Sequence, residues 1–228
     1  MNNYDRVSIL KICMSALIIS LPSAAQADSG LNGSKMAAQT SAHPVVYGSS
    51  QLKDMTYDTL TVYGALDFTN LIIQQELKVD GSAHGKNLKC QEFKINGSLA
   101  VDQLEAHQGL VSGSLTGHNI SILKDLSVEG SLAGDRITVL GRTKIAGNLS
   151  VIGGDFTDID IEGDASDLTD SRAANIHFKK VITDTQKLYL RGKTIVSGDI
   201  VFESGKGEIY LGTDAVIKGQ VKGATIKK

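Results

Sequence analysis

A short phrase, x-(Ile/Val)-x-Gly-x-(Leu/Ala/Ile), recurs along most of this 228-residue chain and indicates a repeat architecture. Its glycines are separated by 17, 16, 16, 17, 17, 16, 35 and 21 residues. These glycines are Gly64, Gly81, Gly97, Gly113, Gly130, Gly147, Gly163, Gly198 and Gly219. We interpret the interval of 35 residues as two coils, with Lys180 in the place of the missing glycine. Self-similarity at a short period is typical of chains whose units pack only on their sequence neighbours.

The apolar residues between two repeat glycines also recur, in pairs that are two positions apart. After Gly113 they are Leu115, Ile120, Ile122, Leu126 and Val128. Such alternation marks the inward side chains of short strands. The sequence therefore predicts an all-β fold, a single-stranded short-coil β-helix (β-solenoid) with three short strands per coil and about ten coils. A core of stacked aliphatic residues needs few aromatic side chains, and this chain has no Trp.

Two further sets of residues share fixed positions in the repeat and predict its corners. The set six residues after the repeat glycine is Asn70, Asn87, Gln103, Asn119 and Arg136. Because Asn tolerates the left-handed backbone conformation, we expect a corner at this position. The set four residues after the repeat glycine is Gly85, Gly117 and Gly134, which predicts a second tight corner. Cys90, nine residues after Gly81, is predicted to point into the core.

The N-terminal residues are typical of a secretory signal peptide. Two basic residues precede a ten-residue apolar run, Ile12–Leu21, and the small residues Ala25 and Ala27 mark a cleavage site after Ala27. We therefore predict a signal peptide at 1–27, a flexible leader at 28–56 and the β-solenoid at 57–228. The apolar run is about half the length that a membrane span needs, so no transmembrane segment is expected. Export places the protein in the periplasm, on the cell surface or outside the cell.

The composition of the chain excludes several classes of function. Removal of residues 1–27 takes two basic and one acidic residue from totals of 23 and 25, which leaves a formal charge of −3 and no basic patch for nucleic acid. Cys90 is then the only cysteine, so no disulfide forms within one molecule. The five histidines fall at unrelated positions of the repeat and predict no metal site. We expect neither a cofactor nor a catalytic constellation.

The repeated V-x-G-x-L phrases and the closing stretch Gly212–Val221 resemble those of bactofilins and related polymer-forming proteins of bacteria. The similarity covers about residues 58–224. The resemblance implies a short-coil β-helix that joins end to end into non-polar filaments without a nucleotide. It also implies a role as a scaffold at the cell envelope. Bactofilins are normally cytoplasmic and lack a signal peptide, so this chain would be an exported version.

One acidic cluster is a candidate binding site. Its members alternate along one predicted strand and project from one side: Asp158, Asp160, Glu162 and Asp164. Such a cluster could bind calcium or supply the two acids of a glycoside hydrolase. Alignment of the coils gives another interpretation, in which the acids form cross-coil ion pairs. The cations at matching positions are Arg142, Lys144 and Lys179.

Tyr189 and Tyr210 form a second candidate. Each lies between two inward apolar residues and so points outward, and the pair is predicted to stack near the C-terminal end. The stack could present an aromatic platform to a glycan or a protein, or could be ordinary sheet packing.

Three functional hypotheses follow. In the first, the protein is a structural scaffold or surface-exposed unit of the bacterial cell envelope that forms homo-oligomers or filaments by end-to-end stacking. In the second, it is a secreted, adhesin-like module that binds an envelope glycan or a protein on one solenoid face, with Tyr189, Tyr210, Asp158, Asp160 and Glu162 as the candidate residues. In the third and least favoured, it is a solenoid enzyme.

Overall fold

The computed structural model describes residues 43–181 and 185–228. Every regular element in these residues is a β-strand. The predicted signal peptide (1–27) and residues 28–42 of the predicted leader lie outside the described residues. No helix that could cross a membrane is found in the described part of the chain.

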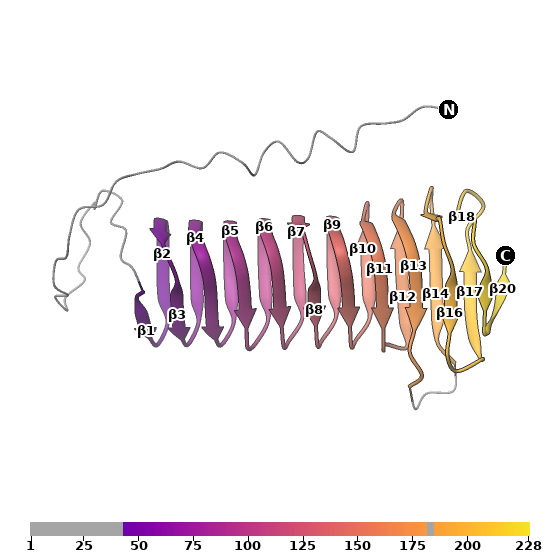
Figure 1. The fold of residues 1–228 in the computed structure, drawn as a ribbon, viewed down its shortest axis with the longest axis horizontal. Helices are drawn as coiled ribbons and strands as arrows, with labels where there is room; N and C mark the ends of the chain where they lie inside the picture. Colours follow the sequence, from indigo (N-terminus) through magenta and orange to yellow (C-terminus); the bar gives the residue numbers. More distant parts are fainter. Residues whose placement is uncertain (1–42, 182–184) are drawn as a thin grey trace. The chain divides into compact units, whose positions relative to one another are not determined.

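The strands form one parallel β-solenoid of about 11 turns, which confirms the predicted fold (Figure 1). Each strand pairs in parallel with the strand at the same position in the next coil, as in β4 with β5 and β5 with β6. The strands are β1 (Val45–Tyr47), β2 (Ser50–Tyr57), β3 (Leu60–Tyr63), β4 (Leu66–Asp80), β5 (Ala83–Ile95), β6 (Leu99–Val111), β7 (Leu115–Ile122), β8 (Leu126–Val128), β9 (Leu132–Ile145), β10 (Leu149–Ile152), β11 (Asp155–Ile161), β12 (Ala165–Thr169), β13 (Arg172–Phe178), β14 (Lys187–Arg191), β15 (Ile195–Val196), β16 (Ile200–Phe202), β17 (Gly207–Leu211), β18 (Val216–Ile217), β19 (Val221–Lys222) and β20 (Ala224–Lys227).

Each regular coil has three faces. In the coil that begins at Gly113, face 1 is residues 115–118, face 2 is residues 120–122 and face 3 is β8, residues 126–128. Faces 1 and 2 are continuous in β7, which turns between them at Asn119. The inward side chains alternate with outward ones and form one aliphatic core along the solenoid.

The predicted left-handed corner between faces 1 and 2 is confirmed. Its five residues have positive φ angles of 54, 58, 69, 53 and 53° in chain order. The corner side chains also bond along the solenoid, since Asn87 Nδ2 donates to Asn70 Oδ1 at 2.5 Å and Asn70 Nδ2 donates to Asp54 Oδ1 at 2.6 Å. An amide that both donates and accepts can continue such a ladder from coil to coil.

The repeat glycines from Gly64 to Gly163 form a single column because no side chain fits between the coils there. A Cβ atom on any of them would lie 2.1–2.8 Å from the carbonyl oxygen of the glycine in the preceding coil. The column is the physical reason for the repeated phrase.

Gly198 and Gly219 do not belong to this column, and the interpretation of the 35-residue interval as two coils is wrong. Gly198 N–H donates to the carbonyl of Ala174 at 2.7 Å, at a corner between faces 2 and 3. The coil after Gly163 is lengthened to 22 residues, as the pairing of Ala165 with Lys187 shows. The extra residues follow Lys180, and the Gln186 side chain bonds to the glycine column there, since its Nε2 donates to the Gly163 carbonyl at 3.2 Å.

The second predicted corner is also wrong. Gly85, Gly117 and Gly134 lie within strands, at one inward position of face 1. At Gly85 the missing side chain leaves room for Phe68, whose ring carbons lie 2.7 Å from where a Cβ would be. Gly109 leaves room for Phe93 in the same way. At Gly117 and Gly134 a Cβ would instead lie 2.1 Å from the Val101 carbonyl oxygen and 1.9 Å from the Gly117 carbonyl oxygen, so glycine there permits the close approach of the preceding coil. None of the three positions is a turn.

Two other predictions concern the core and its start. Cys90 is 6% exposed and lies in register with Ile73 and Ala106, as predicted.

The predicted leader is wrong for its last residues, because β1 and β2 already belong to the solenoid. Leu52 and Met55 in β2 pair with Phe68 and Leu71 and pack against the core. Between them, Lys53 is an outward position of the strand and Asp54 is the left-handed corner residue, with a φ of 54°.

Candidate functional site

The acidic run lies on face 3, on β11 and just beyond it. Asp158, Asp160 and Glu162 alternate with the buried Ile159 and Ile161, so the three carboxylates project from the face as predicted.

The cross-coil register predicted for these acids is confirmed. Asp158 lies opposite Arg142, and Asp160 lies opposite Lys144, in the preceding coil. On the other side, Lys179 Nζ lies 3.0 Å from Glu162 Oε1.

Asp158 bonds to a neutral amide, and the contact of Asp160 with Arg142 is long. Asn175 Nδ2 donates to Asp158 Oδ1 at 2.8 Å, and Arg142 Nε is 3.9 Å from Asp160 Oδ2. Lys144 has no ion pair within the described residues. In the described part of the chain no group of three His, Cys, Asp or Glu residues is placed to hold a metal ion.

His177 joins this cluster, and the sequence analysis did not select it. Its Nδ1 is 3.5 Å from Asp160 Oδ1 and its Nε2 is 3.0 Å from Glu203 Oε1. A neutral imidazole carries one N–H and can donate to only one of these carboxylates, whereas the imidazolium can donate to both. The Lys180 backbone N–H, which donates to Glu203 Oε2, lowers the pKa of Glu203, and the neighbouring His177 lowers it further. The longer coil that follows β13 made Glu203 impossible to align by counting, although His177 lies the regular 17 residues after Asp160.

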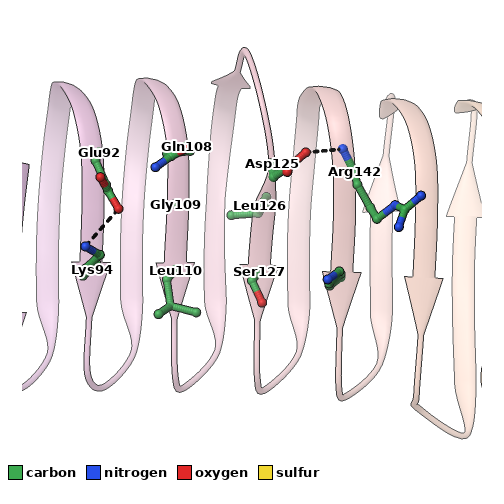
Figure 2. A pocket seen from close by; sticks show the side chains of 10 residues that line it. Glu92, Lys94, Gln108, Gly109, Leu110, Asp125, Leu126, Ser127 and Arg142 are labelled. Carbon is green, nitrogen blue, oxygen red and sulfur yellow. Dashed lines mark hydrogen bonds and ion pairs between the residues drawn. The ribbon is translucent and has the colours of Figure 1, made fainter.

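A shallow depression of about 270 Å³ lies on the same face, toward the N-terminal end from the acidic run (Figure 2). Figure 2 shows that Lys94, Leu110 and Ser127 follow one another in a row across neighbouring coils. The next member of the row is Lys144. Because Leu110 and Ser127 are shorter than the lysines on either side, the surface is hollowed between them.

The walls of this depression carry both signs of charge. Lys94 Nζ is 2.7 Å from Glu76 and 3.0 Å from Glu92, so this cation is compensated within the chain. Asp125 Oδ1 accepts from the Arg142 backbone N–H at 2.8 Å, which leaves the guanidinium directed outward (Figure 2). Of the cations that line the depression, Lys144 has no ion pair within the described residues, and Arg142 lies 3.9 Å from Asp160. The sequence did not predict the depression, and the one residue that could have indicated it is Gly109, which lines its floor.

The predicted tyrosine stack forms on face 1. The rings of Tyr189 and Tyr210 lie 4.7 Å apart between centroids and 15° from parallel. The Arg191 guanidinium is 5.2 Å from the Tyr189 ring, and Lys227 Nζ is 5.3 Å from the Tyr210 ring. Both tyrosines are half-buried. These contacts account for the stack as sheet packing, and its role in partner binding stays a prediction.

A second tyrosine stack was not anticipated. Tyr47 and Tyr63 lie 5.3 Å apart between ring centroids on face 3 of the first coils, and Tyr47 is 78% exposed.

Comparison of the chain with protein-family models, with curated proteins and with solved structures found no match. The functional argument therefore depends on the residues and the geometry described above.

Proposed function

We propose that this protein is an exported structural unit, an assembling scaffold or surface-exposed element of the bacterial cell envelope. The observation that carries the proposal is the state of the outer coils. Inward apolar residues that are fully buried in the middle coils are only half-buried in the outer ones, as at Leu52 in β2 and Ile217 in β18. Ile226 in β20 is 45% exposed.

Strand edges support the same proposal. Within the described residues, the outer edges of β2 and β20 have no strand beside them. An unpaired parallel edge above an apolar layer is a template for a further strand, and a second copy supplies one. The resemblance to bactofilins, the predicted signal peptide and the absence of a recognisable catalytic group in the sequence agree with a non-enzymatic envelope role.

Electron microscopy of residues 28–228 tests this function. We expect filaments, and we expect Leu52→Arg or Ile226→Arg to shorten or abolish them, because each places a charge in the end layer. Thr116→Arg, on the exposed part of face 1, is the matched control and leaves the filaments intact. Filaments that survive both end substitutions would refute end-to-end stacking.

A second candidate function, a secreted binding module, is favoured by the charged depression on face 3. In this case an envelope glycan or a protein would occupy the surface between Lys94 and Lys144. Attachment of the protein to cells or glycans that is unchanged by Lys144→Gln would count against it.

A further inference from the structure

We propose that face 3 is also a lateral interface, on which a second copy of this chain lies antiparallel to the first. The inference rests on the proposed function, because it names a contact through which the scaffold assembles. Its basis is the order of charges along the face. Arg142 and Lys144 lie in one coil, and Asp158 and Asp160 occupy the same two rows in the next. The sign of the charge thus reverses between two neighbouring coils.

A two-fold axis along the strand direction, placed between these two coils, makes the face complementary to itself. The axis reverses the solenoid direction and keeps each row of side chains opposite the same row. Lys144 then lies opposite Asp160 of the second copy, and Arg142 lies opposite Asp158 of the second copy. Each contact occurs twice, so four cation–carboxylate pairs meet at the centre of the interface.

The complementarity continues one coil further out. Glu129 and Lys179 lie in one row, on either side of the axis, because each follows the third-face strand of its coil. They become opposite partners across the interface. In the neighbouring row Ser127 lies opposite His177, which gives a hydroxyl opposite an imidazole.

Two coils from the axis the pairing becomes apolar. Leu110 and Val201 share a row and are both half-buried on the surface of the single chain. They would cover each other in the pair of chains. At the next coil Lys94 lies opposite Lys222, so the complementary surface ends there. It spans six coils, or about 29 Å at a strand spacing of about 4.8 Å.

The depression gives this interface its shape. It lies over Leu110 and Ser127, the positions that meet Val201 and His177 of the second copy. Leu110 and Ser127 follow Lys94 in this row (Figure 2), and both have shorter side chains than the lysine. A hollow on one side of the axis and larger side chains on the other side are what a self-complementary surface requires.

The charge pattern fits a second copy better than an acidic polymer. A polyanion drawn to Arg142 and Lys144 would meet Asp158 and Asp160 one coil away and be repelled there. A second copy brings carboxylates to the cations and cations to the carboxylates at the same time. Lys144, which has no ion pair within the described residues, gains a partner in the pair.

Sedimentation of residues 28–228 in the end-blocked background Ile226→Arg tests the interface. We expect dimers at low salt that dissociate in 1 M salt, where the screening length falls to about 3 Å. Lys144→Asp and Asp160→Lys should each weaken dimerisation at least tenfold, because each places like charges opposite one another twice. Lys86→Asp, an exposed residue of face 1, is the control and should leave the dimer unchanged. A protein that is monomeric at low salt would overturn the proposal.

Mixing the two charge variants separates the interface from effects within one chain. In an equimolar mixture of Lys144→Asp and Asp160→Lys, a mixed dimer has opposite charges at both contacts. We therefore expect the mixture to recover dimers that neither variant forms alone. Loss of dimers without recovery in the mixture would show that the substitutions act on folding and would contradict the interface.

The lateral and end-to-end contacts fail separately. Paired rods that persist with Ile226→Arg, without filaments, would support the lateral interface whatever the fate of end-to-end stacking. Filaments one solenoid wide that are unaffected by Lys144→Asp would refute the lateral interface and leave the proposed function intact.

Discussion

The solenoid contains two kinds of coil. From β1 to β11 the coils are 16 or 17 residues long, and their corners are a glycine column and left-handed Asn, Gln or Arg residues. From β12 onward two coils lengthen to 22 and 21 residues, as the registers of Ala165 with Lys187 and of Lys187 with Glu208 show. The strands there are only two to seven residues long. Parallel stacking of apolar layers is common to both regions, so it determines the fold, whereas the corners are interchangeable.

Buried polar side chains make the longer coils possible. Thr194 Oγ1 lies 2.6 Å from the Arg191 carbonyl oxygen and 2.9 Å from that of Leu168, so its single O–H donates to one of the two, and it accepts from the Ser171 backbone N–H. Gln186 Nε2 donates to the carbonyls of Gly163 and Lys179. In the regular coils the backbone groups of the glycine column bond to one another. In the longer coils these side chains bond to the corresponding backbone groups instead. Within the described residues, the regular region has two buried hydroxyls without such a partner, Ser50 Oγ and Thr143 Oγ1.

The largest expected difference between the regions is in thiol reactivity. Burial raises the pKa of Cys90 to about 12, so at pH 8 only about one thiol in 10,000 is ionised. Labelling by a maleimide should be at least about 1,000-fold slower than in the unfolded chain. A thiol introduced by Val196→Cys in a Cys90→Ala background should label faster, because short strands open more readily. Equal rates would mean that the two regions open together.

Glycine substitutions should separate the regions next. At Gly81 a Cβ would lie 2.1 Å from the Gly64 carbonyl oxygen, at a φ of 154°, so Gly81→Ala should lower the free energy of unfolding by about 3 kcal/mol. At Gly205 nothing lies within 4 Å, and only its φ of 69° opposes a side chain. Gly205→Ala should cost about 1 kcal/mol. Urea unfolding measures both values, and a larger loss at Gly205 would contradict the role of the column.

The two buried threonines should respond with opposite signs. Thr194→Val removes a hydroxyl that serves three backbone groups and should destabilise the fold by about 2 kcal/mol. Thr143→Val removes an unpartnered hydroxyl and should stabilise it by about 1 kcal/mol. Thermal and urea unfolding would show the effects, with the exposed Thr116→Val as the control. A loss of stability in both variants would refute this account of the polar groups.

The smallest effect concerns pH at the C-terminal coils. The side chains of Lys227 and Tyr210 bond to Glu208 and lower its pKa below 4.5. The stabilisation is therefore present above about pH 4.5, and it is lost as the pH falls through the lowered folded-state pKa. Glu208→Gln should slightly lower the melting temperature at pH 7 and leave it unchanged below the lowered pKa, so that the acid limb of a plot of melting temperature against pH becomes flatter. An unchanged acid limb would show that this carboxylate does not contribute.

The sequence predicted those features that are set by one position of the repeat, at a fixed distance from the repeat glycine. Asn119 and its equivalents have few reasons to recur other than a left-handed corner, and Cys90 could be placed by counting from the repeat glycine. Prediction failed where one residue type serves two purposes. Gly85 makes room for Phe68 but was interpreted as a corner, and Gly198 lies at another corner but was interpreted as a repeat glycine.

The candidate site was only partly predictable. The acidic row was visible because its coils have regular lengths, so the alignment of Asp160 with Lys144 followed from counting. His177 lies the regular 17 residues after Asp160 and could have been aligned with it, whereas Glu203 could not, since the lengthened coil after β13 breaks the period. The depression arises from short side chains in successive coils, a property of the surface that no single motif records.

Negative-stain electron microscopy of residues 28–228, across protein concentration and salt, tests most directly whether this solenoid works by assembly. The account predicts filaments of uniform width, with rods paired side by side at low salt. Single rods about 50 Å long under every condition would contradict it, and a ligand for the solenoid faces would then be the object to find.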